Sequence, residues 1–233
     1  MFRFALKARI DVLPTGANLR RWSKSRHGSC VLCQGYETLH HTLNWCNVAL
    51  KQGRFTWRHD SILLRIYMSL FDEGLDRNKW DAYTDLYGLG CPGGGTVPNI
   101  LVSYEVKQRP DLVLVDTSAK KCVVFELTVP FETNTNDAHA RKMEKYRKLC
   151  DDIRNSGFDC TLLCFEAGSR GLITKDNRLR LQEFFHLAGC EVNAKTNRLI
   201  LKAISQIAVR ASYSIFMARK RVVWHSPAPV LIH

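Results

Sequence analysis

Three cysteines and a histidine lie close together near the N-terminus of the chain. Cys30, Cys33, His41 and Cys46 have the spacing C-x2-C-x7-H-x4-C. Structural zinc sites use four sulfur or nitrogen ligands in a tetrahedron, and a tight turn followed by a helix start can supply two ligands each. The spacing predicts a closed, structural zinc site, with His40 as the competing ligand for His41. Two buried thiols beside an unrelated histidine are the alternative interpretation.

The remaining cysteines give no indication of a disulfide framework. The chain has nine cysteines, and its basic start lacks the continuous apolar region of a signal peptide. We therefore expect reduced thiols. Hydrophobic residues make up 45% of the 233 residues, which is enough for a core. We see no uninterrupted apolar run of the ~20 residues that a membrane span requires, so no membrane partner is expected.

Periodicity and turn residues divide the chain into two expected domains, a basic zinc-binding segment at 1–53 and a larger α/β domain at 54–233. Apolar residues at helical spacing predict a helix over 54–75, and glycines and prolines predict a loop over 88–98. Short β-branched runs predict the next strands. The complete expectation for the second half is strands at 100–106, 112–115, 122–129 and 160–165, and helices at 137–153, 177–187 and 194–216.

Positive charge favours a nucleic-acid partner. The chain has 34 Lys and Arg against 22 Asp and Glu, a formal net charge of +12. Cations and an aromatic residue suited to grip phosphates and stack on bases precede the zinc cluster: Arg20, Arg21, Trp22, Lys24 and Arg26. We expect a polyanionic partner, with nucleic acid ahead of an acidic membrane; among nucleic acids, DNA is the first candidate and RNA the second. Trp22 has an alternative role as the small core of the zinc-binding segment.

The segment between Asp111 and Glu126 predicts a β-hairpin that brings two carboxylates together. Apolar runs at 112–115 and 122–125 flank a polar turn at 117–120. If the hairpin is symmetric about the middle of this turn, Asp111 stands opposite Glu126 on one face of the sheet. Opposed residues in an antiparallel pair have Cβ atoms ~5 Å apart, close enough for two carboxylates to bind one divalent cation. The hairpin therefore predicts a Mg²⁺ or Mn²⁺ site.

A lysine near these carboxylates would complete a site for phosphodiester cleavage. Such cleavage uses a metal ion to activate water and a cation to assist at the phosphate. In nucleases of the restriction-enzyme type the lysine stands two residues after the glutamate, but here that position is Thr128. The helix expected at 137–153 carries Lys142 and Lys145 beside its apolar stripe, so either can reach back toward the hairpin.

The alternative interpretation makes these residues ordinary surface groups: Asp111 ends a loop, Glu126 is a solvated strand residue and the lysines form a basic helix face. The strand around Glu126, Val-Val-Phe-Glu-Leu-Thr-Val, argues against it. Such a strand is expected to be buried, and a buried carboxylate requires a metal or a partner. We therefore predict that Asp111, Glu126, Lys142 and Lys145 are catalytic, with Glu105 as a candidate auxiliary acid.

The order of these motifs resembles the C-terminal region of the R-two-like site-specific non-LTR retrotransposon polyproteins. The resemblance runs from the zinc motif through Arg58-His59-Asp60 and Arg109-Pro110-Asp111 to Glu126 and Lys142-x2-Lys145-Tyr146. In that family a CCHC zinc knuckle precedes a restriction-like endonuclease of the PD-(D/E)xK type. The resemblance implies a mixed sheet flanked by helices, with metal-binding acids at Asp111 and Glu126 and catalytic lysines at Lys142 and Lys145.

The resemblance also implies a role in the life cycle of a mobile element. The family's endonuclease nicks target DNA, which implies nuclear localisation and a reverse transcriptase supplied by a longer polyprotein. Arg58, His59 and Arg109 would then contact nucleic acid, although Asp60 replaces the family's asparagine and a simple helix start is the alternative for this motif. Two rival functions are an inert nucleic-acid-binding remnant and a structural zinc protein with a protein partner. Oligomeric state is not predicted.

Overall fold

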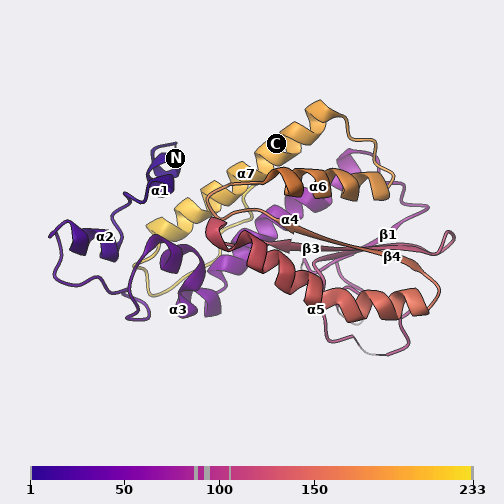
Figure 1. The fold of residues 1–233 in the computed structure, drawn as a ribbon, viewed down its shortest axis with the longest axis horizontal. Coiled ribbons are helices and arrows are strands. Elements are labelled where there is room, and N and C mark those ends of the chain that lie inside the picture. The colour runs from indigo at the N-terminus through magenta and orange to yellow at the C-terminus, as the bar shows by residue number, and fades with distance from the viewer. Residues whose placement is uncertain (1, 87–88, 92–94, 105, 232–233) are drawn as a thin grey trace.

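The computed structural model describes residues 2–86, 89–91, 95–104 and 106–231. The fold is α/β, a four-stranded mixed sheet flanked by helices, with a cysteine-rich cluster near the N-terminus (Figure 1). In chain order the elements are α1 (Phe2–Arg9), α2 (Gly16–Arg21), the π-helical turn η1 (His41–Trp45), α3 (Asn47–Lys51), α4 (Arg54–Asp72), β1 (Asp81–Thr84), β2 (Leu112–Asp116), β3 (Lys121–Thr128), the 3-10 turn η2 (Glu132–Asn134), α5 (Thr135–Asn155), β4 (Asp159–Glu166), α6 (Lys175–Leu187) and α7 (Ala194–Met217).

The sheet has the order β1-β2-β3-β4, and the β2–β3 hairpin forms its centre. β1 and β3 are antiparallel to β2, whereas β4 is parallel to β3 and is reached through the crossover helix α5. Leu112 pairs with Phe125 and Val113 with Val124. This register confirms the predicted hairpin, whose next pair toward the open end would be Asp111 and Glu126.

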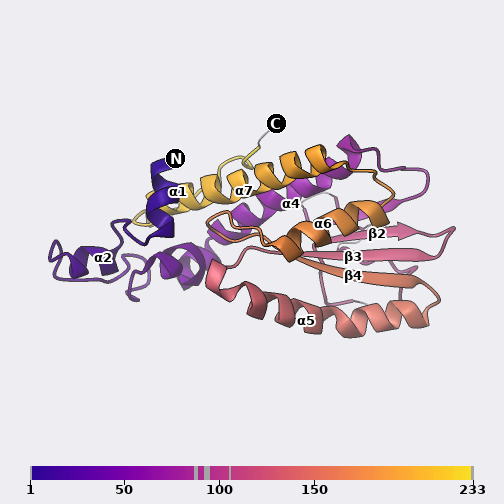
Figure 2. The ribbon, with the colours of Figure 1, turned by 45° about the horizontal axis from the view of Figure 1, so that its top comes forward.

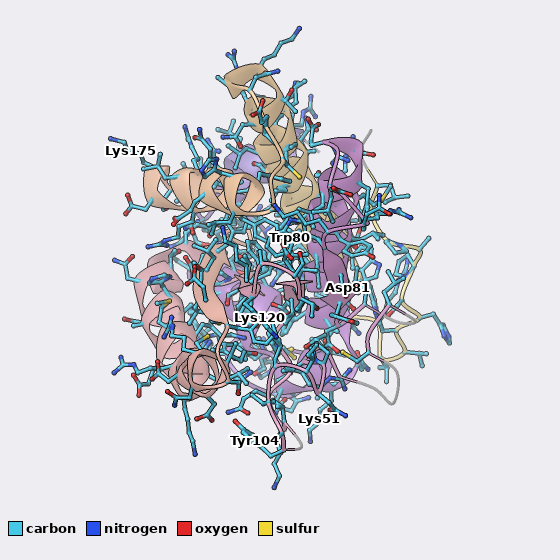
Figure 3. All side chains as sticks on the ribbon, turned by 90° about the vertical axis from the view of Figure 1, so that its right-hand side faces the viewer. Lys51, Trp80, Asp81, Tyr104, Lys120 and Lys175 are labelled. Atoms are coloured by element: carbon cyan, nitrogen blue, oxygen red, sulfur yellow. The ribbon has the colours of Figure 1, made fainter. Side chains whose placement is uncertain are left out.

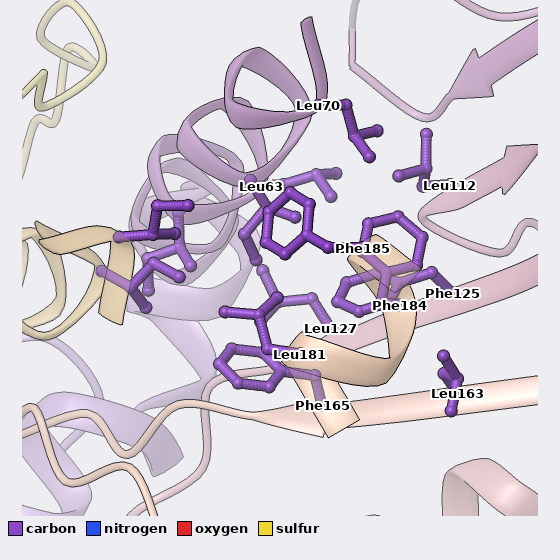
Figure 4. Packing of buried hydrophobic residues seen from close by; sticks show 14 of the residues in the cluster. Leu63, Leu70, Leu112, Phe125, Leu127, Leu163, Phe165, Leu181, Phe184 and Phe185 are labelled. Carbon is purple, nitrogen blue, oxygen red and sulfur yellow. The ribbon is translucent and has the colours of Figure 1, made fainter. Parts of the chain in front are cut away.

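Both faces of the sheet are covered by helices (Figure 2). Alternate residues of β2 and β3 pack on α4, α6 and α7, where Phe125 lies 4.3 Å from Phe184 between ring centroids (Figure 4). The intervening residues, such as Val113 and Val124, pack against α5 through Tyr146 and other apolar residues of that helix. Burial on both faces explains why these strands are almost continuously apolar. It also means that a carboxylate on either face lies inside the protein.

Helix α7 is a core helix by its packing. Ile204, Ile207 and Ala208 are fully buried within the main hydrophobic cluster. By length and composition the helix could cross a membrane, but half of its most apolar stretch is buried inside the protein. Figure 3, viewed toward the β2–β3 turn near Lys120, shows side chains filling the space between the helical layers, with Lys175 pointing away from the protein.

The N-terminal segment packs against the α/β part. Phe4 and Leu43 share a hydrophobic cluster with Trp57 of α4 and with Ile215 and Phe216 of α7. The expected boundary at residue 53 falls at the start of α4, where Gly53 adopts a left-handed conformation with φ of 73° that favours glycine. The division into two domains there stays a prediction.

The strand expected at 100–106 is wrong for the residues that the structure describes. Residues 100–104 and 106 form turns and coil, although Leu101 and Val102 are buried. The apolar residues of this run are buried, but they do not form a strand. Leu101 and Val102 pack in the same hydrophobic cluster as residues of α5, and the segment does not pair with the sheet. Part of the expected loop at 88–98 and the candidate acid Glu105 lie outside the described residues. Strand β1 and helices α1 and α2 were not predicted.

Candidate functional site

The four predicted zinc ligands converge in the structure. Cys30 and Cys33 lie in a tight turn in which the Cys30 amide donates to the Gly35 carbonyl at 2.7 Å. His41 begins η1, and Cys46 stands between η1 and α3. The turn and the helix start therefore each bring two candidate ligands to the cluster, as the spacing predicted.

The geometry of this cluster suits a tetrahedral ion. Its four ligand atoms all lie within 4.8 Å of one another. The sulfurs of Cys30 and Cys46 are 3.9 Å apart, and Cys33 Sγ lies 3.2 Å from His41 Nε2. Ligands of a tetrahedral zinc ion at bond lengths of ~2.0 to 2.3 Å stand about 3.3 to 3.8 Å apart. The cluster could therefore hold a metal such as zinc.

The shifted pKa values of Cys30 and His41 bear on how the cluster would bind a metal ion. Burial and the nearby Cys46 raise the pKa of Cys30 to about 11, so a bound cation must displace its proton. Burial lowers the pKa of His41, which keeps its imidazole neutral and able to bind a metal. Gly35 lies against the His41 ring, where an added Cβ would be 3.2 Å from His41 Cε1.

The competing ligand His40 points elsewhere. Its ring stacks on Phe131 with centroids 4.5 Å apart, and the Trp45 ring meets its edge at 5.5 Å. Among the described residues, the one group of three or more Cys, His, Asp or Glu that could hold a metal includes His41 and not His40. The histidine left open by the spacing is thus assigned to His41.

The predicted carboxylates meet at the open end of the β2–β3 hairpin. The Asp111 amide donates to Glu126 Oε2 at 3.2 Å, and the Leu127 amide donates to Asp111 Oδ2 at 2.7 Å. Glu126 is 1% exposed and Asp111 is 7% exposed. Burial and the Asp111 carboxylate raise the pKa of Glu126, while Lys142 opposes that rise. Two buried carboxylates, the acid pair Asp111 and Glu126, thus lie side by side at this end of the hairpin.

The backbone around Asp111 is held from several directions. Its carbonyl accepts from the Asp85 amide at 3.0 Å and from Thr84 Oγ1 at 2.8 Å. On the preceding residues, the Pro110 carbonyl accepts from Thr96 Oγ1 at 2.7 Å. The edge strand β1, which sequence reasoning missed, therefore helps to fix the position of the first carboxylate.

Helix α5 brings Lys142 to the carboxylates. Its ammonium donates to Glu126 Oε1, and its side chain is 21% exposed. The side chain of Lys145 takes another direction, since its ammonium donates to Tyr146 Oη at 2.8 Å. Tyr146 in turn donates to the Arg109 carbonyl at 2.9 Å, just before Asp111. The structure thus places Lys142 in direct contact with Glu126, whereas Lys145 contacts Tyr146, which in turn holds the chain just before Asp111.

His59 also joins the acid pair, a placement that the sequence did not reveal. Its Nε2 lies 3.2 Å from Asp111 Oδ2 and 3.3 Å from the Leu127 carbonyl, and its Nδ1 lies 3.0 Å from Asp60 Oδ1. Burial favours the neutral ring, but the carboxylates of Asp111 and Asp60 outweigh burial and raise the pKa of His59 to about 10. The imidazolium at the start of α4 therefore orients Asp111.

The structure corrects the expected role of Arg58. The residue is 1% exposed, and its guanidinium donates to Ser212 Oγ at 3.0 Å and to the Val129 carbonyl at 3.4 Å. Burial lowers the pKa of Arg58 to about 10, against the favourable influence of Glu132. Arg58 fastens α4 to α7 and to the segment after β3, so it is not part of a surface for nucleic acid.

Of the other predicted nucleic-acid contacts, His59 is turned inward to Asp111, whereas Arg109 and the basic residues before the zinc cluster lie at the surface. Arg109 is 62% exposed along its side chain and pairs with Asp85. The basic residues before the zinc cluster are all exposed, and Trp22 at 36% is more exposed than a core residue: Arg20, Arg21, Trp22, Lys24 and Arg26. They follow Thr15, which caps α2 by accepting from the Asn18 amide. This basic segment presents its charges to solvent.

A second buried acid lies on the neighbouring strand. Glu166 at the end of β4 is 1% exposed and contacts His139 of α5 at 3.0 Å and Arg180 of α6 at 3.1 Å. Burial raises its pKa, while His139 and Arg180 oppose the rise. The sequence signal was an acid closing an apolar strand. His139 and Arg180 together satisfy Glu166 and join β4 to both helical layers.

Comparison with known proteins assigns no family to this chain. No protein-family model matches it, and no curated protein matches it. The resemblance to R-two-like elements stays a prediction, and inference about function rests on the chemistry of the two sites.

Proposed function

We propose that the protein is a divalent-metal-dependent DNA endonuclease with a restriction-like fold. The observation that carries this proposal is the meeting of Asp111, Glu126 and Lys142 at one end of the β2–β3 hairpin. Two buried carboxylates and an ammonium form the set that metal-assisted phosphodiester hydrolysis uses. The mixed sheet with its central hairpin and flanking helices supports the restriction-like assignment.

Asp111 and Glu126 would hold Mg²⁺ or Mn²⁺, because hard divalent cations prefer carboxylate and carbonyl oxygens. The Leu127 carbonyl is a candidate third ligand, since His59 Nε2 contacts both this oxygen and Asp111 Oδ2. A bound ion would supply an activated water and neutralise charge on the phosphate. Lysine and histidine partners balance the buried negative charge when the ion is absent.

Lys142 is the residue we assign to the phosphate. Its partly exposed ammonium lies at the mouth of the acid pair, where it can bind a phosphate oxygen on which charge develops. Lys145 would support it by holding Tyr146, which fixes the chain before Asp111. His59 would act as a positioning residue by orienting Asp111.

The zinc cluster and the basic segment would position DNA. With four protein ligands the zinc site has no open position, so its role is structural. The exposed charges of the basic segment suit phosphates, and Trp22 suits stacking on a base. A retrotransposon origin and nuclear localisation complete the proposal, with reverse transcriptase supplied by another part of a polyprotein.

Nicking of supercoiled plasmid tests the proposed activity. The wild-type protein is expected to produce nicked circles with Mg²⁺ or Mn²⁺, and Asp111→Asn is expected to lose this activity while keeping the shape of the side chain. Asp159→Asn is the matched control, because Asp159 is an exposed acid at the start of β4. Equal nicking by wild type and Asp111→Asn would refute the proposal.

A non-catalytic nucleic-acid-binding protein is the second candidate. The exposed basic segment beside the zinc cluster favours it, because those residues need no active site to bind phosphates. Salt-sensitive DNA binding without metal-dependent nicking in the plasmid assay would select this function.

A further inference from the structure

Helix α5 carries two exposed rows of charged side chains, and the first row contains its own counterions. The helix covers the face of the sheet opposite to α4, α6 and α7 (Figures 1 and 2). In this row Arg147 contacts Glu144 at 2.7 Å, and Arg154 contacts Asp151 at 2.7 Å. Each arginine is thus paired with an acid one turn before it, so the positive charges of this row are balanced.

The second row, which we call the cationic row, consists of Arg141, Lys145 and Lys148. Residues spaced by four and by three positions share one face of a helix, and all three side chains are exposed. Among the residues that the structure describes, no acid forms an ion pair with any of the three. The cationic row therefore presents positive charge to solvent without a counterion from the same part of the chain.

The acids on α5 that lie one turn from the cationic row are engaged in other ways. Glu144 contacts Arg147, and Asp152 accepts from Tyr104 Oη at 2.6 Å. Asp137 stands in the first turn of α5, where the helix dipole favours a negative charge. The unbalanced charge of the row is thus a consequence of where these acids are held.

One end of the cationic row lies beside the Glu126 side of the acid pair. Arg141 lines a cavity of about 290 Å³ together with Thr128 and Val129, which follow Glu126 closely at the end of β3. Lys142, the next residue of α5, contacts Glu126 itself. Arg141 therefore stands next to the lysine that we assign to the scissile phosphate.

The middle of the cationic row lies beside the Asp111 side of the acid pair. The Lys145 ammonium donates to Tyr146 Oη at 2.8 Å, and Tyr146 donates to the Arg109 carbonyl at 2.9 Å, just before Asp111. Lys148 continues the row one turn farther along α5. The row therefore passes both members of the acid pair.

The length of the cationic row suits the spacing of DNA phosphates. An α-helix rises about 1.5 Å per residue, so Arg141 and Lys148 stand about 10 Å apart along the axis of α5. The phosphates of one strand in duplex DNA follow one another every ~3.4 Å of helix axis. The row and Lys142 can therefore contact neighbouring phosphates of a strand that runs along α5.

The surroundings of the cationic row favour DNA over an anionic membrane. A helix that lies on a membrane buries an apolar face in the lipid. On α5, however, Tyr146 is fully buried, and Met143 lines a cavity with Arg147 and Arg154 of the other row. The cationic row thus offers charge without exposed apolar side chains, which suits a phosphate backbone.

We propose that the cationic row binds the backbone of the DNA strand being cut, with Arg141 and Lys148 on phosphates that flank the scissile phosphate at Lys142. This flanking placement rests on the proposed nuclease function. Guanidinium and ammonium groups donate charge-assisted hydrogen bonds to phosphate oxygens. Such contacts read no base sequence, but they fix the register of the strand at the acid pair.

The salt dependence of DNA affinity tests the cationic row. Affinity for a short fluorescein-labelled DNA duplex is measured by anisotropy at several salt concentrations, without added Mg²⁺ or Mn²⁺. Arg141→Gln and Lys148→Gln are each expected to lower the slope of log affinity against log salt by ~0.9, the value for one lost phosphate contact. Both side chains are exposed, so both variants should keep the melting temperature of the wild-type protein.

Arg147→Gln is the matched control. It removes the same charge from the same helix, at a side chain that is 68% exposed but paired with Glu144. Its slope should equal that of the wild-type protein. An unchanged slope in Arg141→Gln or Lys148→Gln, or an equal fall in Arg147→Gln, would overturn the proposal.

Plasmid nicking separates this proposal from the nuclease function. If both hold, Arg141→Gln and Lys148→Gln should raise the KM for plasmid, because contacts made equally before and during the reaction act on KM. Lower slopes without nicking by the wild-type protein would support DNA binding by the row and refute the nuclease function. Nicking by the wild-type protein with unchanged slopes in both variants would do the reverse.

Vesicles that contain phosphatidylserine test the membrane as an alternative partner. The wild-type protein and Arg141→Gln should bind them equally weakly. Vesicle binding that both variants lose, with unchanged slopes for DNA, would assign the row to a membrane and overturn the proposal.

Discussion

Replacing Lys142 by methionine is expected to lower the stability of the metal-free protein and to raise its affinity for a divalent cation. The ammonium of Lys142 is the cation in direct contact with the Glu126 carboxylate, which is 1% exposed. Removing one partner of a buried ion pair costs ~3 to 5 kcal/mol. The Lys142 side chain is 21% exposed and the Asp111 amide still donates to Glu126, so we expect a loss of about 2 kcal/mol.

Thermal unfolding and Mn²⁺ titration test this expectation. A loss of about 2 kcal/mol corresponds to a melting temperature lower by about 4 to 8 °C in a chain of this size. Mn²⁺ should bind the variant at least about tenfold more tightly, because the ammonium no longer competes for Glu126. Plasmid nicking should nevertheless fall, since the cation assigned to the phosphate is gone.

The pH dependence of the stability loss follows from the raised pKa of Glu126. The unfolded glutamate ionises near ~pH 4.3, and Lys142 stabilises the folded protein only when Glu126 is charged. The loss should therefore be full above the raised pKa of Glu126 and should shrink as the pH falls through that pKa, because Glu126 then takes up a proton. Lys148→Met is the control, an exposed lysine on the same helix. A variant at Lys142 with the stability and Mn²⁺ affinity of this control would refute the reasoning.

Three further perturbations address the zinc cluster, the core and the basic segment. Cys46→Ala should abolish binding of one zinc ion and lower the melting temperature, whereas Cys190→Ala should keep the zinc, as measured by metal content; zinc retained by Cys46→Ala would contradict the ligand assignment. Phe184→Ala should cost ~3 to 5 kcal/mol of unfolding free energy in denaturant titrations, because the ring is fully buried against Phe125; a loss below about 1 kcal/mol would contradict this packing. Replacing Arg20 and Arg21 by glutamine should lower the slope of log affinity for single-stranded DNA against log salt by ~0.7 per lost phosphate contact; an unchanged slope would remove these residues from the interface.

The hairpin was predictable because several sequence signals agreed there. Apolar runs on both sides of a polar turn fixed the register, and the register placed Asp111 beside Glu126. The later helices were also predicted well, with α7 observed at Ala194–Met217 against an expectation of 194–216. Apolar residues at regular spacing indicate which face of a helix or strand is buried, and burial on one face is what determines these elements.

Other features depend on contacts between distant segments, which local patterns do not encode. Strand β1 has only four residues and exists because it pairs with β2, while Leu101 and Val102 are buried without joining the sheet. His59 reaches Asp111 from another element, and Arg58 is buried through partners on α7 and after β3. The helix that carries Arg58 and His59 was predicted, but the partners that each side chain contacts were not.

Rates of metal-dependent plasmid nicking by Asp111→Asn, Glu126→Gln and the double variant test most directly whether the two carboxylates act together on one ion. Each single substitution should lower the nicking rate at least about a hundredfold, because either one breaks the shared site. The double variant should then be hardly slower than the singles, since residues that act as a unit are not additive. Single variants with the wild-type rate, or two losses that multiply in the double variant, would contradict the proposed site.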